Sequence, residues 1–260
     1  MNASESPSQA PKRGMVLAAG LGLRMRPITL ATPKPLIEIG GRSMLDRALD
    51  ALAAADVARV VVNVHYLASA IEAHLADRPV PETVVSHEQS RLETGGGVAK
   101  ALPLLGSEPF YVVNGDVLWR DGATPSLRQL ASAWDAEAMD ALLLLHPTAT
   151  ARGYDGPGDF FCETSGRLRR RGDQPSAPVL FAGLQILHPR LFDGVGEDSF
   201  SLNVLYDRAI AAGRLFGVIH QGGWCHVGTP ADIPLAEAFL LDDPIDDPPV
   251  IASQPPSPAS

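Results

Sequence analysis

The stretch Met15-Val-Leu-Ala-Ala-Gly-Leu-Gly-Leu-Arg-Met-Arg-Pro27 passes directly from an apolar run into a turn of small residues and arginines. A short, fully apolar run such as Met15–Ala19 is typical of a parallel strand that is covered on both faces. Runs of the same kind recur at Arg59–Val64, Phe110–Asn114 and Ala141–Leu145. The sequence therefore predicts at least four buried strands, the first of which leads into an unusual loop.

Segments with helical character alternate with these strands. They cover Met44–Ala55, where Ser43 and Asp46 resemble a capping box, and Leu67–Ala76, Val98–Leu105 and Leu127–Ala138. This β-α alternation predicts a doubly wound, Rossmann-like α/β sheet. From Asp159 onward the pattern changes to strand-like pieces at Phe160–Glu163 and Val179–Leu187, then helices near Asn203–Ala212 and Pro230–Leu241. We expect this part to form a lobe added to the same sheet.

Two terminal segments differ from the rest in composition. Residues 1–13 are rich in Ser, Pro and Ala, and residues 242–260 are rich in Asp, Pro and Ser. Both compositions are typical of disordered tails. No repeat or linker interrupts residues 14–241, so the sequence predicts one domain between two tails.

The overall composition limits the classes of partner. A chain of 260 residues with 45% hydrophobic content can bury a sizeable core, and its formal net charge of −9 argues against nucleic acids and anionic membranes as partners. Cys162 and Cys225 lack the spacing of a metal site or a disulfide framework. Without a signal peptide or a membrane-spanning run, we expect a soluble, cytoplasmic protein, with monomer and dimer both left open.

The loop after the first strand combines features of an anion-binding site. Ala18, Ala19, Gly20 and Gly22 allow backbone N–H groups to approach an anion closely, and Arg24 adds a planar set of donors. The spacing matches neither the Rossmann fingerprint nor the P-loop. Taken alone, such a turn is more often a plain connection between a strand and a helix.

A lysine held between two prolines follows this loop. In Pro33-Lys-Pro-Leu36 the prolines restrict the backbone and so fix the position of Lys34. Together the loop and this tetrapeptide resemble the signature of the sugar nucleotidyltransferases, enzymes that make UDP-, GDP-, dTDP- and ADP-sugars. The resemblance implies a glycosyltransferase-A type mixed sheet whose added lobe binds the sugar, with a nucleoside triphosphate and a sugar-1-phosphate as partners. It also implies that the loop wraps the triphosphate and that Arg24 and Lys34 act on its phosphates.

The segment Asn114-Gly-Asp116 places a carboxylate just beyond a predicted strand. Carboxylate oxygen is the ligand that Mg²⁺ prefers, although such a tripeptide alone is more often a turn. The family resemblance implies that Asp116 is the catalytic metal ligand and that Asn114 lies at the nucleotide. Where the family more often has a second aspartate, this chain has His226. Imidazole suits Mn²⁺ or Co²⁺ better than Mg²⁺, and a structural histidine is the alternative.

Further segments resemble family positions around the base and the sugar. Leu92-Glu-Thr-Gly-Gly-Gly97 precedes a predicted helix, and its bare backbone suits contact with a flat base, the alternative being a glycine-rich helix entry. The resemblance implies nucleotide contacts by Glu88, Thr94, Gly95 and Gly96, and sugar contacts by Gly183 and Asn203. The sequences of residues 92–97 and of Phe200-Ser-Leu-Asn203 are most similar to those of uridylyltransferases that act on N-acetylmuramate-1-phosphate in peptidoglycan recycling.

The resemblance predicts transfer of a nucleoside monophosphate, from UTP by preference, to a sugar-1-phosphate, with N-acetylmuramate-1-phosphate favoured and pyrophosphate released. Within the enzymes, the alternative is a mannose-1-phosphate guanylyltransferase, which shares the loop and the lysine. From another class, the alternative is a nucleotide-sugar-binding sensor that lost turnover when His226 replaced aspartate. Metal-dependent release of pyrophosphate distinguishes the sensor from the enzymes.

Overall fold

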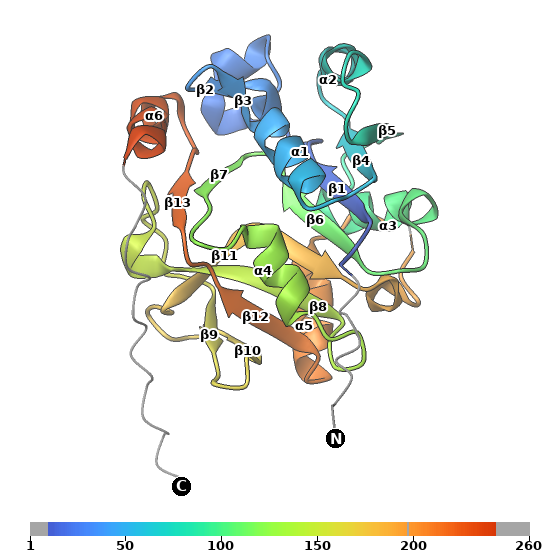
Figure 1. Ribbon diagram of the computed structural model, residues 1–260, viewed down its shortest axis with the longest axis vertical. Helices are drawn as coiled ribbons and strands as arrows, with labels where there is room; N and C mark the ends of the chain where they lie inside the picture. The colour runs from blue at the N-terminus through green and yellow to red at the C-terminus, as the bar shows by residue number, and fades with distance from the viewer. Residues whose placement is uncertain (1–9, 197, 243–260) are drawn as a thin grey trace, which may run out of the picture.

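A computed structural model describes residues 10–196 and 198–242, and its centre is a nine-stranded mixed sheet (Figure 1). The principal path of the sheet runs β10-β9-β11-β6-β1-β4-β5; off this path β8 pairs with β11, and β12 pairs with β8. The strands are β1 (Arg13–Leu17), β4 (Arg59–Val64), β5 (Glu82–His87), β6 (Phe110–Asn114), β8 (Ala141–Pro147), β9 (Phe160–Cys162), β10 (Leu168–Arg170), β11 (Val179–Leu187) and β12 (Leu215–Ile219). The predicted α/β class is confirmed.

The first half of the sheet is parallel, with β1 between β4 and β6, and β5 beyond β4. Parallel neighbours direct their carboxyl ends to one edge. The register places Leu17 opposite both Asn63 and Asn114, so the loops after β1, β4 and β6 begin at the same level. This edge is where an open α/β sheet binds ligands.

The second half extends the same sheet with antiparallel pairs. The long strand β11 pairs with β6 on one side and with β8 on the other, and β9 and β10 continue the sheet beyond it. A register shift between Phe181 and Gln185 interrupts the β11–β8 ladder. The structure therefore confirms that the later segments join the sheet of the first half.

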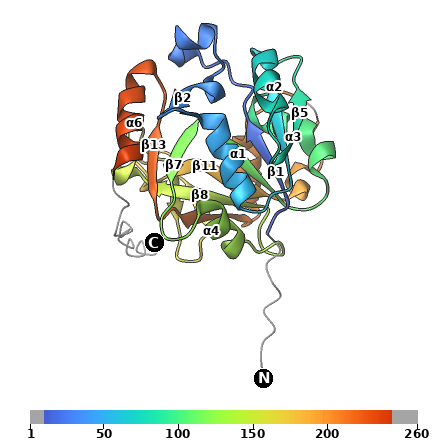
Figure 2. The same ribbon diagram turned by 45° about the horizontal axis from the view of Figure 1, so that its top comes forward.

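Helices cover both faces of the sheet (Figure 2). On one face, α1 (Met44–Ala54), α2 (Ala68–Ala76) and α4 (Ser126–Ala133) share a hydrophobic cluster with one set of strand side chains. On the other, α3 (Glu93–Leu105) and α5 (Leu202–Ala211) pack against the opposite set. Alternate strand residues serve alternate faces, as Val16 and Met15 do, because neighbouring side chains of a strand point to opposite sides.

A third hydrophobic cluster supports the loops above one end of the sheet. It joins α6 (Ile233–Leu241) to two small two-stranded sheets, β2 (Glu38–Ile39) with β3 (Arg42–Ser43) and β7 (Val117–Arg120) with β13 (Gly223–His226). Met25, from the loop after β1, is buried in this cluster. The cluster therefore anchors the loop that carries Arg24 and Lys34. Six short 3₁₀ turns complete the architecture at 23–25, 28–30, 34–36, 148–150, 189–192 and 230–232.

Several boundaries differ from those predicted. Helix α3 begins at Glu93 and so includes the three glycines, whereas α4 ends at Ala133 because Trp134 has extended backbone. The sequence patterns do not predict strands β2, β3, β5, β7, β10, β12 and β13. The structure places Arg13 in β1, while residues 1–9 and 243–260 of the two predicted tails lie outside the described residues. Within 10–196 and 198–242, no helix is long and apolar enough to cross a membrane.

Candidate active site

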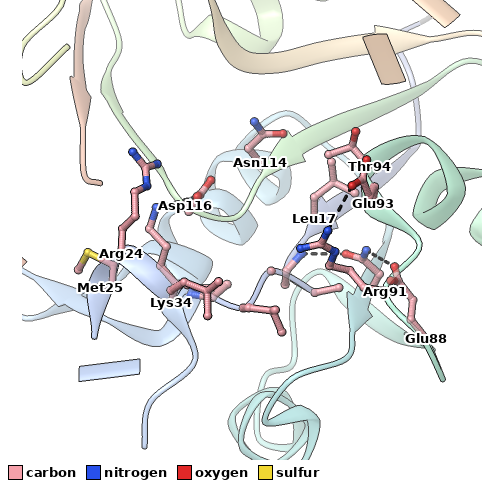
Figure 3. Close-up of a pocket in the computed structure, with 18 of the residues that line it drawn as sticks. Leu17, Arg24, Met25, Lys34, Glu88, Arg91, Glu93, Thr94, Asn114 and Asp116 are labelled. Atoms are coloured by element: carbon pink, nitrogen blue, oxygen red, sulfur yellow. Dashed lines mark hydrogen bonds and ion pairs between the residues drawn. The ribbon is translucent and has the colours of Figure 1, made fainter. Parts of the chain in front are cut away.

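A cleft of about 630 Å³ opens at the carboxyl edge of the parallel strands (Figure 3). Arg24, Lys34 and Asp116 lie at one end of it, and Glu88, Arg91, Glu93 and Thr94 lie at the other. The loop after β1 and Asn114 connect the two ends. The geometry therefore brings together residues that are far apart in the sequence, in a cleft with a basic end and an end formed by the start of α3.

The loop after β1 is held in one conformation by its glycine and by its neighbours. Gly22 has a φ of 58°, and a Cβ there would lie 2.8 Å from the Thr29 side chain. The Thr29 hydroxyl in turn donates to the Gly22 carbonyl at 2.8 Å. Residues 17–25 all line the cleft, including Ala18, Ala19, Gly20, Gly22 and Arg24, and their contact with a triphosphate stays a prediction.

Lys34 forms an ion pair with Asp116. Its Nζ donates to Oδ2 of Asp116 at 2.8 Å, and Lys34 is only 8% exposed, although it carries a charge. The flanking Pro33 and Pro35 set the short turn that directs the side chain into the cleft. The two groups that the sequence assigned to phosphate and metal are therefore direct neighbours, which the sequence did not predict.

The turn that carries Asp116 approaches β1 very closely. Gly115 donates its backbone N–H to the Leu17 carbonyl at 2.9 Å, and a Cβ at Gly115 would lie 2.7 Å from that oxygen. Only glycine fits such an approach without a shift of the backbone. The contact fixes Asn114 and Asp116 against the glycine loop, and both side chains line the cleft.

His226 lies beside the end of the cleft that holds Asp116, although it is not among the residues that line the cleft. It is the last residue of β13 and pairs with Val117 of β7, the residue after Asp116. A Cβ at Gly228 would lie 2.6 Å from the His226 Nε2 and 3.4 Å from the nearest Arg24 nitrogen. Burial, together with the charges of Lys34 and Arg24, lowers the pKa of His226. The ring is therefore neutral at neutral pH, the form that binds metals.

The donor set at this end fits a divalent ion with few protein ligands. One carboxylate, half-exposed in the cleft, and one neutral imidazole leave other positions to water and to phosphate oxygens, as is usual for Mg²⁺. The described residues contain no group of three or more His, Cys, Asp or Glu side chains that would hold a metal ion alone. A metal site here would therefore depend on substrate phosphates.

At the other end of the cleft, Glu88 is buried, and both of its carboxylate oxygens accept hydrogen bonds. Its two oxygens accept hydrogen bonds from the Asn63 side chain at 2.6 Å and from the Leu92 backbone at 3.0 Å. Asn63 also accepts a hydrogen bond from the Ala18 N–H at 2.8 Å. That N–H, predicted to face an anion, is thus used within the protein.

The three glycines of 95–97 lie inside the fold, behind the cleft wall. Gly95 and Gly96 donate their N–H groups to the Phe200 carbonyl, and a Cβ at Gly95 would lie 2.2 Å from the Phe200 ring. The structure does not place Gly95 or Gly96 among the residues that line the cleft. Their glycine character is explained by close packing against 198–202, and a contact with the base stays a prediction.

The two predicted sugar residues lie near the cleft without lining it. Gly183, with a φ of 88°, packs against Asn114 and Val117, where a Cβ would lie 2.7 Å from the Val117 side chain. Asn203 is exposed in the first turn of α5, and its carbonyl accepts a hydrogen bond from Arg170. The neighbouring Ser201 does line the cleft. Sugar contacts by Gly183 and Asn203 stay predictions.

Sequence reasoning missed Asn63, Arg91, Glu93 and Ser201 at the cleft. Asn63 could have been found, since it is a polar residue inside the apolar run Arg59–Val64. Glu93 has a φ of 57°, an uncommon backbone conformation for a residue with a side chain, and it pairs with Arg91 at 3.3 Å. No sequence pattern indicates that conformation.

Comparison with known proteins gives one family and a consistent set of relatives. Residues 14–189 match the family model of the MobA-like NTP transferase domain. The chain is 43% identical over 240 residues to an N-acetylmuramate alpha-1-phosphate uridylyltransferase of Caulobacter vibrioides, covering 90% of this chain and 99% of that protein. It is 33% identical over 231 residues to a protein of the same name from Neisseria meningitidis serogroup B, covering 87% and 97%.

A more distant relative and a solved structure agree with this pattern. Mannose-1-phosphate guanylyltransferase catalytic subunit beta of Drosophila pseudoobscura pseudoobscura is 28% identical over 229 residues, which cover 85% of this chain and 60% of that protein. A putative glucose-1-phosphate thymidylyltransferase from Bacillus anthracis superposes with a TM-score of 0.73 at 17% identity, covering 89% of this chain and 96% of that one. The solved structure supports the fold alone.

Proposed function

Because the chain belongs to the sugar-1-phosphate nucleotidyltransferase family, with a MobA-like NTP transferase domain over residues 14–189, we propose that it transfers the uridylyl group of UTP to N-acetylmuramate-1-phosphate and releases pyrophosphate. The observation that carries this proposal is the 43% identity that extends over 99% of a uridylyltransferase with that substrate in its name. The coverage includes both halves of the sheet, so it spans the whole of the cleft.

The two-ended cleft supports the same reaction. Its basic end carries Lys34 and Arg24 and suits the phosphates, whereas its other end, beside Glu88 and Thr94, suits the base. The uncharged residues 17–23 lie between them and bring backbone close to the linking part of a nucleotide. A bound nucleotide would therefore extend along the cleft with its α-phosphate near Asp116.

The proposed chemistry is an in-line displacement at phosphorus. A phosphate oxygen of the sugar-1-phosphate forms a bond to the α-phosphorus, the bond to the oxygen bridging the α- and β-phosphates breaks, and pyrophosphate leaves with that electron pair. The attacking oxygen is already anionic at neutral pH, so no general base is needed. Lys34 and Arg24 reduce the repulsion between the two anions and hold them in line.

A divalent ion would be held by Asp116 with His226 as a second donor, and it would supply further neutralisation of phosphate charge. Lys34 would then donate to phosphate oxygens instead of to Asp116. Because Lys34 is nearly buried, its ammonium has lost water and gains much from such a contact. Mg²⁺ is the ion we propose, with Mn²⁺ or Co²⁺ as alternatives that imidazole favours.

Two other functions are alternatives that the experiment below tests. A mannose-1-phosphate guanylyltransferase would use the same loop and lysine, and such an enzyme is a more distant relative. A nucleotide-sugar-binding sensor would bind the same ligands without turnover. A ring whose pKa is lowered still offers a lone pair to a metal, so a histidine at position 226 does not by itself imply a loss of turnover.

The experiment measures pyrophosphate release with UTP, GTP, CTP, ATP and dTTP, each with a panel of sugar-1-phosphates, in Mg²⁺ and after chelation by EDTA. The proposal expects metal-dependent release with UTP and N-acetylmuramate-1-phosphate. Preferred release with GTP and mannose-1-phosphate would favour the guanylyltransferase. Nucleotide-sugar binding with no release from any pair would favour the sensor.

A further inference from the structure

A chain of buried hydrogen bonds crosses the carboxyl ends of three parallel strands. It begins at the Ala18 N–H after β1, passes through the Asn63 side chain of β4, and reaches the Glu88 carboxylate after β5. From there it continues to the Leu92 N–H at the start of α3. Each of its three bonds is between 2.6 and 3.0 Å. This hydrogen-bond chain therefore connects the loop after β1, at the proposed phosphate end of the cleft, with the start of α3, which forms the wall at the proposed base end.

The two side chains in the middle of this hydrogen-bond chain, Asn63 and Glu88, are buried and hydrogen-bonded. Asn63 is 2% exposed and Glu88 is 5% exposed. Asn63 uses its oxygen for Ala18 and its nitrogen for Glu88, so the direction of both bonds is fixed by the amide. The Glu88 backbone is held as well, because its N–H donates to the Val64 carbonyl and its carbonyl lies 2.9 Å from the His65 Nδ1.

Helix α3 passes so close to this pair that only a glycine fits at position 97. A Cβ at Gly97 would lie 2.7 Å from the Glu88 Oε1 and 2.9 Å from the Asn63 Nδ2. Both distances are shorter than a carbon normally allows, so any larger residue at 97 would displace the pair. Gly97 thus explains why α3 can pass directly over the hydrogen bond.

We propose that Asn63 is a positioning residue of the nucleotide site, which acts through Glu88 and Ala18 to fix the spacing between the phosphate loop and the base wall. The proposal rests on the proposed function, since it assumes that a nucleotide spans the two ends of the cleft. A nucleotide gains affinity when both ends are held at the right spacing in advance. Loss of the pair should therefore weaken binding of the whole nucleotide more than binding of its triphosphate part.

An exchange of the two side-chain types gives a direct test. Asn63→Asp places two carboxylates against each other, and Glu88→Gln places two amide donors against each other or against the Leu92 N–H. The double variant Asn63→Asp/Glu88→Gln restores all three bonds. Its carboxylate at position 63 accepts from the Ala18 N–H and from the amide at position 88, whose oxygen accepts from the Leu92 N–H. Each single change thus breaks the chain and the pair of changes repairs it.

The readouts are the KM for UTP, the KM for the sugar-1-phosphate, equilibrium affinities for UTP and for inorganic triphosphate with Mg²⁺, and the melting temperature. We expect each single variant to raise the KM and the dissociation constant for UTP about 10-fold or more. The KM for the sugar-1-phosphate and the affinity for triphosphate should change less than about 3-fold, because Arg24, Lys34 and Asp116 take no part in this hydrogen-bond chain. The double variant should regain most of the lost UTP affinity.

Gln185→Met is the matched control, since Gln185 is a fully buried polar residue of β11 that accepts a hydrogen bond from Tyr206 away from the cleft. It should lower the melting temperature and leave both KM values unchanged. Single variants that behave like this control would overturn the proposal, because a structural role alone would explain them. A double variant that regains no UTP affinity would also overturn it, because Asn63 would then not act through Glu88.

Failure of the proposed function would give results that differ from those of a failed positioning role. A wild-type protein that binds UTP but releases no pyrophosphate from any substrate pair refutes the enzyme, while the binding measurements still decide the role of Asn63. A wild-type protein that binds no nucleotide refutes both. Normal turnover by the wild type with unaltered UTP binding in both single variants refutes only the positioning role.

Discussion

At the scale of single residues, the basic end of the cleft is defined by a lysine that has almost no access to water. Lys34 is fixed by two prolines and paired with Asp116 at 2.8 Å. A buried ammonium needs a partner of opposite charge, and Asp116 supplies it. Because Asp116 is itself half-exposed, it is free to exchange that partner for a cation when phosphates arrive at Lys34.

Lys34→Ala should lower kcat/KM about 100-fold or more, since one preorganised charge contact contributes about 3 kcal/mol to the transition state. The fold should persist, because the remaining Asp116 carboxylate reaches solvent. Steady-state kinetics and thermal melting measure the two effects, with Lys12→Ala, a change at an exposed lysine, as the control. Unchanged kinetics in Lys34→Ala would contradict a phosphate role.

His226→Asp should shift the metal preference toward Mg²⁺, because a carboxylate is a harder ligand than imidazole. Burial and the charges of Lys34 and Arg24 lower the pKa of the histidine, so the wild-type ring stays neutral to below its ordinary pKa of about 6.5. The measurement is the ratio of kcat/KM in Mg²⁺ to that in Mn²⁺, with His188→Asn as the control. An identical ratio in the wild type and in His226→Asp would show that His226 is not a metal ligand.

At the scale of elements, helix α3 shows how a sequence signal and its physical cause can differ. The sequence suggests that the glycines of 95–97 present bare backbone to a base, yet the structure uses them to admit Phe200 and the Asn63–Glu88 pair. Helix propensity disfavours three successive glycines, so the sequence predicts a helix only from Val98. Tertiary packing against α5 outweighs that local cost.

Gly95→Ala should lower stability by on the order of 1 to 3 kcal/mol, because the new Cβ would lie 2.2 Å from the Phe200 ring. Gly20→Ala is the matched control for stability, since no atom lies within 4 Å of a Cβ built there. Thermal and urea unfolding of the two variants give the comparison. Equal stability of Gly95→Ala and the wild type would show that the Phe200 segment is not packed as described.

The elements that the sequence predicts correctly are those whose residues follow a clear period. The apolar runs at 59–64 and 110–114 form β4 and β6 with the predicted bounds, and 179–187 forms β11. Strand β5 gives a weaker signal because its burial is partial. Strands β7 and β13 also give weak signals, because each has only four residues and the ladder between them is equally short. The ion pair of Lys34 with Asp116 joins positions 82 residues apart, a relation that no local pattern contains.

At the scale of the whole molecule, the cleft lies where the order of the parallel strands reverses. From β1 the chain passes to β4 and β5 on one side and then returns as β6 on the other side of β1, with Asp116 two residues beyond the end of β6. Such a switch point leaves space between neighbouring loops for a ligand. The loop after β1 and the turn after β6 supply the walls, and the bulged part of β11 packs beneath them at Gly183.

A buried histidine pair in the second half of the sheet makes stability depend on pH. His146 and His220 lie with their Nδ1 atoms 3.3 Å apart and are each 1% exposed. Burial lowers the pKa of each ring to about 4. The unfolded chain binds protons below about 6.5, whereas the folded protein does not until about 4, so stability should fall as pH decreases through that interval.

The pH dependence is measured as the free energy of urea unfolding between about pH 7 and pH 4.5, within the interval that the two rings span. Each pKa unit of difference corresponds to about 1.4 kcal/mol, so the loss should reach a few kcal/mol. Asp140 does not interfere: burial raises its pKa, but hydrogen bonds from Arg190 and Arg214 bring it below 3.8. Its contribution is therefore lost only at lower pH. His146→Gln/His220→Gln should flatten the slope, and His74→Gln should retain most of it. A wild-type slope in the double variant would contradict the assignment.

The central claim is that this cleft joins UTP to N-acetylmuramate-1-phosphate, and an internal competition tests it most directly. The protein is incubated with Mg²⁺, equimolar UTP and GTP, and equimolar N-acetylmuramate-1-phosphate and mannose-1-phosphate, and the nucleotide sugars formed are separated and quantified. While little substrate has been consumed, the ratio of products reports the relative specificity of the protein for the competing substrate pairs. We expect UDP-N-acetylmuramate to exceed GDP-mannose by about 10-fold or more, the discrimination that about 1.4 kcal/mol provides. GDP-mannose in equal or greater amount would contradict the account.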